Sequence, residues 1–206
     1  MPWINSITGG FATGSNESNS NAVMIYNLLS SFGYSFNPIC AILGNIGYES
    51  GYNPWRWQSD VVLWDNQYNL IDNQTGHAYG LLQFDPAGQY IHNADAQQAV
   101  GYAPNFANRT GGQNDGTAQL YYMNYIAGQY GYGYFPTASY PLSFSEFKQS
   151  TQSVAYLTDA WLYNYERGTD NPLRKQYSAY WEQNLPLLVN TRRKMPWIYY
   201  LRRRRY

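Results

Sequence analysis

The chain has 206 residues, which is long enough for one domain of ordinary size with a substantial core. Charged residues make up only 13% of it and aromatic residues 18%, with 23 tyrosines and 7 tryptophans. Disordered proteins have few aromatic residues and many charges, so this composition excludes a disordered chain. Because Tyr and Trp combine an apolar face with a polar edge, some of them are suited to stacking on sugar rings, while most should fill the core.

Several classes of site are not expected. The single cysteine, Cys40, cannot form an intramolecular disulfide and is expected to be an inert thiol in the core. Two histidines, His77 and His92, give no recognisable metal-ligand cluster, so we expect no metal and no cofactor. No stretch approaches the ~20 apolar residues of a membrane span, and the N-terminus lacks the features of a secretory signal.

The net charge of zero hides an asymmetry along the chain. Residues 1–190 contain all 13 acidic groups and six basic ones, whereas residues 191–206 contain seven basic groups and no acidic group. Such a basic C-terminal tail can bind an acidic partner surface, anionic wall polymers or nucleic acid, or it can fold back on the acidic body of the protein.

The first part of the chain predicts a flexible arm followed by two helices. Residues 1–20 are rich in Gly, Ser, Asn and Thr and are expected to be loose. A first helix should span about residues 21–32. A second should begin with Asn37 as its N-cap and Pro38 in its first turn, and it should end before Gly51.

The rest of the chain predicts a small β element and further helices. Residues 55–79 alternate short β-branched and aromatic runs with turn residues, which indicates an irregular hairpin or small sheet. Asp85 should cap a helix that starts at Pro86, and Ser143 and Glu146 have the spacing of a capping box. Loops are expected at residues 101–116 and 128–142. The remaining helices are expected at residues 117–127, 151–165 and 171–186.

Glu49 is the most conspicuous acidic residue of the sequence. It lies at the end of the second predicted helix and is the only carboxylate between Glu17 and Asp60. Apolar neighbours and the negative end of a helix dipole both favour the neutral form of a carboxyl group, which is the form that a general acid needs. The alternative is a glutamate at a helix end that simply points into water.

Four segments together resemble one protein family. They are AILGNIGYESGYNP, Trp57-Gln58, YGLLQFDPAGQYI and AWLYNYER, and they are similar to the phage tail lysozyme family, including the lysozyme domain of tail-knob wall hydrolases of small podophages. The resemblance covers about residues 21–185. It implies an α+β, mainly helical, lysozyme-like fold with a small β hairpin or sheet lobe and a cleft between the lobes. The expected domains are an arm at 1–20, a catalytic domain at 21–190 and a tail at 191–206.

The resemblance also implies an activity. The protein would cleave the β-1,4 bond between N-acetylmuramic acid and N-acetylglucosamine in bacterial peptidoglycan, with Glu49 as general acid. Hen egg-white type lysozymes have an aspartate directly before the Tyr-Gly of the cleft bend, where this chain has Ala78, so the pattern is closer to goose-type lysozymes and lytic transglycosylases.

A second catalytic carboxylate is therefore not supplied by the resemblance. Asp72 is the first candidate for holding the attacking water, followed by Asp60 and Asp65, although Asp72 also fits a plain turn residue. Asp85 fits a helix cap better than a catalytic group.

The predicted sugar contacts are Gln83, Tyr79, His77 and Glu166. Gln83 is the strongest of these, because an amide can both donate to and accept from an N-acetyl group. Glu166 resembles a family position near the cleft, but a structural pairing with Arg167 or a neighbouring amide is the competing interpretation.

Two other functions remain open from the sequence. A lytic transglycosylase would use the same glutamate and leave a 1,6-anhydro end instead of a reducing end. A non-catalytic glycan-binding or structural tail protein would not need Glu49 at all. The protein would lie in the phage tail or be released into the host cell or periplasm, and its partners would be glycan strands and, through the basic tail, other tail proteins rather than nucleic acid.

If the basic C-terminal tail anchors the protein in a virion, the chain should be present in purified particles and absent when residues 191–206 are deleted. Mass spectrometry of the particles measures this. Particles that keep the truncated chain at the full level would contradict the anchoring role.

Overall fold

The computed structural model describes residues 2–6, 9–60, 64–65, 69–70, 77–91, 115–129 and 133–193. This part of the chain is mainly helical, as the sequence predicts. Its helices are α1 (Asn16–Ser31), α2 (Phe36–Ser50), α3 (Gly88–Ile91), α6 (Asp115–Gly128), α7 (Phe144–Gln149), α8 (Val154–Trp161) and α9 (Pro172–Arg193), with a 3-10 turn η1 (Gln58–Asp60) and a π-helical turn η2 (Leu162–Glu166).

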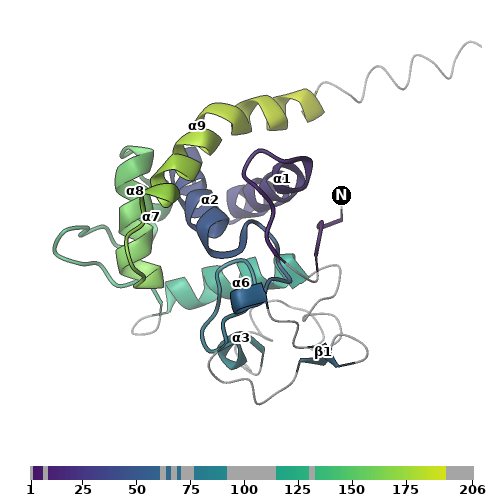
Figure 1. The fold of residues 1–206 in the computed structure, drawn as a ribbon. Helices are drawn as coiled ribbons and strands as arrows, with labels where there is room; N and C mark the ends of the chain where they lie inside the picture. Colours follow the sequence, from purple (N-terminus) through teal and green to yellow (C-terminus); the bar gives the residue numbers. More distant parts are fainter. Residues whose placement is uncertain are drawn as a thin grey trace, which may run out of the picture.

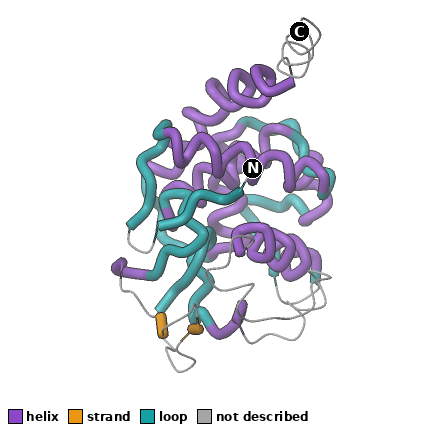
Figure 2. Tube along the Cα trace, turned by 90° about the vertical axis from the view of Figure 1, so that its right-hand side faces the viewer, coloured by secondary structure: helices purple, strands orange, loops and turns teal. Residues whose placement is uncertain are grey.

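The helices form a bundle above α6, and a smaller part lies below it. In Figure 1, α1, α2, α7, α8 and α9 gather on one side of α6, whereas α3 and β1 lie on the other. The view in Figure 2 agrees, with most helices in the upper part and the short strands at the lower end. None of the described helices is both long enough and apolar enough to cross a membrane.

Helix α2 is the centre of the bundle. Ten of its 15 residues are buried, so neighbours surround it on nearly all sides and not on one face only. Its start differs slightly from the prediction, because Ser35 and not Asn37 occupies the N-cap position. Its end is as predicted: Gly51 has φ 56° and ψ 38°, a left-handed conformation that glycine adopts without strain.

At Gly44, the backbone of α2 lies directly against the Ser178 side chain and the backbone of α9. A β-carbon at this position would lie 1.8 Å from Oγ of Ser178 and 2.5 Å from the carbonyl oxygen of Arg174. Only glycine fits such an approach. The contact brings the first turns of α9 against the C-terminal half of α2, and this sets the distance between side chains that project from the two helices.

The N-terminal segment differs from the predicted loose arm. Helix α1 starts at Asn16, because Ser15 caps it by accepting a hydrogen bond from the amide of Ser18. The Trp3 side chain is 5% exposed and donates to Thr117 at 2.8 Å. Residues 2–6 and 9–15 therefore pack on the domain, because the apolar start of the chain has a buried place to go.

The last helix is longer than predicted. We expected it to end near Pro186, but α9 continues to Arg193 with the proline inside it. Proline removes one backbone donor, a cost of ~3 kcal/mol in a helix interior. Leu185 is buried and Leu188 and Val189 pack against the core on the far side of the proline, so apolar contacts on both sides of it favour continuation.

The predicted β lobe is only partly within the described residues. Trp64–Asp65 (β1) and Asn69–Leu70 (β2) form one short antiparallel pair. Residues 61–63, 66–68 and 71–76 lie outside the described part of the chain, so the β lobe stays a prediction. The expected loop at 101–116 lies mostly outside it as well.

The smaller local predictions have mixed outcomes. The capping box of Ser143 and Glu146 is present. The helix expected at Pro86 begins at Gly88 instead, so Asp85 does not occupy its N-cap position. Cys40 is a free, fully buried thiol, and burial raises its pKa to about 12, which keeps it in the unreactive thiol form.

The close contact at Gly44 gives a test of this packing. Gly44→Ala should lower the free energy of unfolding by about 1–3 kcal/mol, because the facing carbonyl oxygen belongs to a helix backbone that cannot move aside cheaply. Gly128→Ala is the matched control: among the described residues, its β-carbon would meet nothing closer than the Phe144 ring at 3.7 Å. It should be neutral or stabilise by up to about 1 kcal/mol. Urea unfolding measures both, and equal stabilities of the two variants would contradict the packing.

Candidate active site

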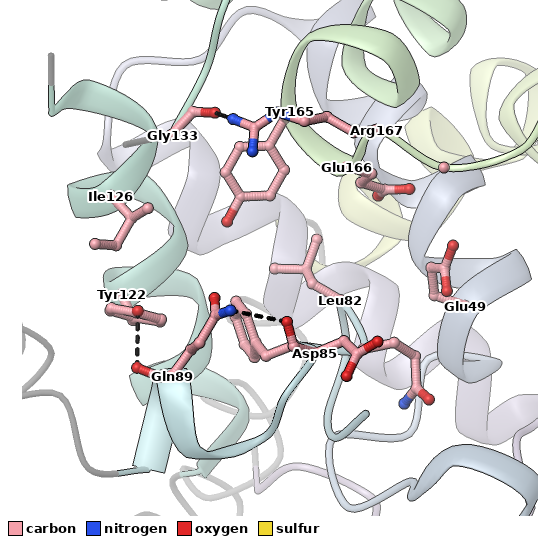
Figure 3. Close-up of a pocket in the computed structure, with 13 residues that line it drawn as sticks. Glu49, Leu82, Asp85, Gln89, Tyr122, Ile126, Gly133, Tyr165, Glu166 and Arg167 are labelled. Carbon is pink, nitrogen blue, oxygen red and sulfur yellow. Dashed lines mark hydrogen bonds between the residues drawn. The ribbon is translucent and has the colours of Figure 1, made fainter. Parts of the chain in front are cut away.

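A pocket of about 370 Å³ opens between the bundle and the bend that precedes α3, residues 78–86, and Figure 3 shows it with the side chains that line it. This size lies in the range of small-molecule sites. Its lining residues come from α2, the bend, α3, α6 and the π-helical turn: Glu49, Leu82, Gln83, Phe84, Asp85, Gln89, Tyr122, Ile126, Gly133, Tyr165, Glu166, Arg167 and Gly168.

A second pocket continues from the first. It is lined by Tyr48, Glu49, Arg56, Gln58, Ser59, Ala78, Gln83 and Asp85. The two pockets share Glu49, Gln83 and Asp85, so these three side chains stand where the pockets join. We call the two pockets together the groove. A ligand lying along it would pass over these three polar groups.

Glu49 reaches the groove from the last turn of α2. Its side chain is 22% exposed, so it is neither buried in the core nor in open water. The left-handed Gly51 ends the helix directly after it and turns the chain away, which leaves the carboxyl at the rim. Glu49 therefore occupies the predicted position, but its main partner is a cation and not the apolar environment expected from the sequence.

That partner is Arg174, from the first turn of α9. Its guanidinium donates from Nη2 to Oε1 of Glu49 and from Nη1 to Oδ1 of Asn45 at 2.8 Å. Asn45 precedes Glu49 by four residues and so lies on the same face of α2. The guanidinium also lies over the Tyr48 ring, 4.3 Å from its centroid. These contacts with Asn45, Tyr48 and Glu49 hold the Arg174 guanidinium against the C-terminal part of α2.

Glu166 is the second carboxylate on this cation. Its Oε2 accepts from Nη1 of Arg174 at 2.7 Å, and its Oε1 accepts from Nε1 of Trp161 at 3.0 Å. It ends the π-helical turn, where Arg167 adopts a left-handed φ of 54°. Single π turns of this kind often occur at functional sites. Here the turn brings Glu166 back over Trp161 and onto Arg174.

The charges of Glu49, Glu166 and Arg174 do not sum to zero when both carboxyls are ionised. Arg174 and Glu166 have side-chain exposures of 3% and 7%, and with both carboxyls ionised the group with Glu49 would carry one excess negative charge. Burial, and second the Glu49 carboxylate, raise the pKa of Glu166 to about 8 against the opposing effects of Arg174 and the Trp161 N–H. Because the carboxyls share one cation, their protons belong to the pair and not to either residue alone.

Gln119 of α6 fixes the opposite wall. Its Oε1 accepts from the amide of Leu81 at 2.7 Å, and its Nε2 donates to the carbonyl of Pro54 at 2.7 Å. One side chain thus ties the bend to the segment that follows α2. Asp115 supports it from below, accepting from Gln119 and from two tyrosine hydroxyls. The bend is therefore held at a set distance from the end of α2.

Two of the predicted sugar contacts lie on this bend, and they differ in outcome. Gln83 lines both pockets, but its amide nitrogen donates to the carbonyls of Arg56 and Gly80 at 3.1 and 2.9 Å. A contact from Gln83 to a sugar would therefore use its amide oxygen as an acceptor. Tyr79 is fully buried and its hydroxyl donates to Asp115 at 2.5 Å, so the prediction of a sugar contact is wrong for this residue.

The remaining predicted residues have other positions. His77 is half-buried and accepts at its carbonyl from Ala87, and its neighbour Ala78 lines the second pocket. Glu166 lines the first pocket, and its oxygens accept from Trp161 and Arg174. Its ion-pair partner is therefore Arg174 and not the predicted Arg167.

The candidates for the second catalytic carboxylate differ in their positions relative to the groove. Asp72 lies outside the described residues, and so does the side chain of Asp65. Asp60 is exposed and pairs with Arg56 at 3.0 Å. Asp85, which we expected to cap a helix, lines both pockets with Glu49, and Figure 3 shows the two on facing sides of the first.

Sequence reasoning missed Asp85, Asn45 and Arg174 as members of the site. Arg174 lies 125 residues from Glu49 along the chain, and nothing local marks it as a partner. The four-residue spacing of Asn45 and Glu49 on one helix was the only signal available. Among the described residues, no group of three or more His, Cys, Asp or Glu side chains could hold a metal ion.

Comparisons with known proteins identify the family of the chain. A family model described as phage tail lysozyme matches residues 20–185, which include Glu49, Gln83, Glu166 and Arg174. Morphogenesis protein 1 of Bacillus phage B103 is 29% identical over 172 residues. The alignment covers 82% of this chain but only 40% of that relative. The match over most of the chain shows that it belongs to the phage tail lysozyme family, a membership that suggests a role in peptidoglycan hydrolysis.

Proposed function

We propose that the protein is a muramidase that cleaves the β-1,4 bond between N-acetylmuramic acid and N-acetylglucosamine. The observation that carries this is the position of Glu49, a partly exposed carboxyl where two pockets join. A glycan strand lying along the groove would place one glycosidic oxygen beside this group, with sugars bound on both sides of it.

Glu49 is the general acid in this proposal. Protonation of the leaving oxygen allows the C–O bond to break through an oxocarbenium-like transition state. Glu49 becomes a carboxylate beside Arg174, which stabilises the new charge. Water then adds to the sugar carbon and releases its proton, so the product carries a reducing end. The amide oxygen of Gln83 is available to accept from the N–H of an N-acetyl group.

Asp85 is the candidate for orienting the attacking water. Asp85 lies across the groove from Glu49 and is exposed to solvent. A carboxylate in such a position can accept a proton from water while the acid on the other side protonates the leaving group. Asp72 remains the candidate that the sequence predicts.

A lytic transglycosylase is the second candidate function, because it needs the same single acid and no second carboxylate. In that reaction the 6-hydroxyl of the muramic acid would replace water and give a 1,6-anhydro end.

A non-catalytic glycan-binding tail protein would use the groove without the acid. We also propose that the protein is part of the virion tail, which the family description, phage tail lysozyme, supports.

Glu49→Gln should reduce cleavage of purified peptidoglycan about 10²–10⁴-fold, the usual contribution of a positioned general acid. Glu182→Gln, an exposed glutamate of α9, is the matched control and should keep full activity. Mass spectrometry of the wild-type products should show reducing ends. Undiminished cleavage by Glu49→Gln would overturn the proposal, and 1,6-anhydro ends would favour the transglycosylase.

Asp85→Asn should reduce hydrolysis by about 10²-fold, because the amide cannot accept the proton of the attacking water. The matched control is Asp60→Asn, which removes an exposed carboxylate paired with Arg56 and should change the rate little. Initial rates of reducing-end release measure both. Equal rates for the two variants would exclude Asp85 and return the role to Asp72.

A further inference from the structure

The contact between Arg174 and Glu49 creates a difficulty for an acid catalyst. A carboxyl group paired with a guanidinium is favoured in its ionised form, whereas a general acid must carry a proton. Arg174 is 3% exposed, so water does not weaken this interaction much.

Glu166 changes this balance because it competes for the same cation. Both of its oxygens accept N–H donors, one from Arg174 and one from Trp161. Its side chain is 7% exposed, compared with 22% for Glu49. We call Glu49 and Glu166 the carboxyl pair. One guanidinium neutralises one negative charge, so the pair and Arg174 together are neutral when the pair holds one proton.

We propose that Glu166 is a positioning residue that acts through Arg174: by taking up the charge of the guanidinium, it keeps one proton on the carboxyl pair near neutral pH and so keeps Glu49 competent as an acid. This inference rests on the proposed function of Glu49. The two carboxyls share this proton through one guanidinium. Glu49 is the more exposed member of the pair and lines both pockets, so it is the member that passes the proton to a substrate.

Burial supports the retention of this proton, since it is the main cause that raises the pKa of Glu166 to about 8, with the Glu49 carboxylate second. Other titratable groups face the pair. Tyr165 is next to it, and burial raises the pKa of its hydroxyl far above neutrality, so that it stays uncharged. Arg167 donates to the carbonyl of Gly133 and lies over the Phe135 ring. Tyr122 and Asp85 line the same groove.

The proton balance of a turnover follows from this arrangement. The O–H proton of Glu49 moves to the glycosidic oxygen, and the pair then carries two negative charges on one guanidinium. The attacking water loses a proton, and the uptake of one proton by the pair restores its neutral form with Arg174. The excess charge in the intermediate stage favours this uptake, so Glu166 also helps to reset the acid.

The pH dependence of peptidoglycan cleavage tests the proposal. In Glu166→Gln the guanidinium has Glu49 as its one carboxylate, so the alkaline limb of the rate profile should move to lower pH by about one unit or more. Glu166→Asp keeps the carboxylate, so its alkaline limb should lie between those of Glu166→Gln and the wild type. Glu182→Gln should follow the wild type. A Glu166→Gln profile that superimposes on the wild type would overturn the proposal, because loss of packing alone lowers the rate at every pH.

Stability as a function of pH gives a second measurement that does not need activity. Burial and the Glu49 carboxylate raise the pKa of Glu166 from 4.5 to about 8, so the folded carboxyl pair keeps a proton that the unfolded chain releases near pH 4.5. The stability that this proton contributes is present at low pH and is lost as pH rises through this range. The melting temperature of the wild type relative to Glu166→Gln should therefore fall between about pH 4.5 and 8. A difference that is constant or rises would overturn the proposal.

The two proposals can fail separately. If Glu49→Gln is inactive while the Glu166→Gln profile and melting curve match the wild type in their pH dependence, Glu49 is the acid and Glu166 is only structural. If Glu49→Gln stays active, the proposed function is wrong, and the melting curves still decide whether the carboxyl pair holds a proton.

Discussion

The site depends on one buried cation shared by two carboxyl groups. Arg174 is almost fully enclosed and contacts Glu49, Glu166 and Asn45 through the same guanidinium. A buried cation with no carboxylate would cost several kcal/mol, and two carboxylates on one cation leave an excess charge that a proton can remove. The electrostatics that stabilise this corner of the fold are therefore the same electrostatics that control protonation at the groove. Stability and chemistry cannot be tuned independently here.

The rest of the fold places this cation and the facing wall. Gly44 lets α9 approach α2 closely enough for Arg174 to reach the last turn of α2. The π-helical turn returns Glu166 to the same point, and Gln119 ties the bend that carries Asp85 to the segment after α2. Each of these is a short-range steric or hydrogen-bond constraint. In the proposed function, these constraints together determine where a glycan would lie relative to Glu49.

The sequence predicted the elements that rest on local signals. The helical content, the left-handed end of α2 at Gly51 and the capping box at Ser143 all depend on residues a few positions apart. It failed where distant contacts overrule local preference. The N-terminal segment packs because Trp3 reaches Thr117, and α9 continues past Pro186 because Leu188 and Val189 beyond it pack against the core. Tyr79 was taken for a sugar contact, since an exposed tyrosine and a buried, hydrogen-bonded one look alike in a sequence. Arg174 carried no local signal.

The central claim is that the carboxyl pair at the groove holds a proton near neutral pH. The chain has only five glutamates, so a ¹³C titration of labelled glutamate carboxyls can follow each one. Our account predicts that one titration step occurs well above the ordinary glutamate range near pH 4.3, and that this step disappears in both Glu49→Gln and Glu166→Gln. Ionisation of all five carboxyls below about pH 5.5 in the wild-type protein would contradict it.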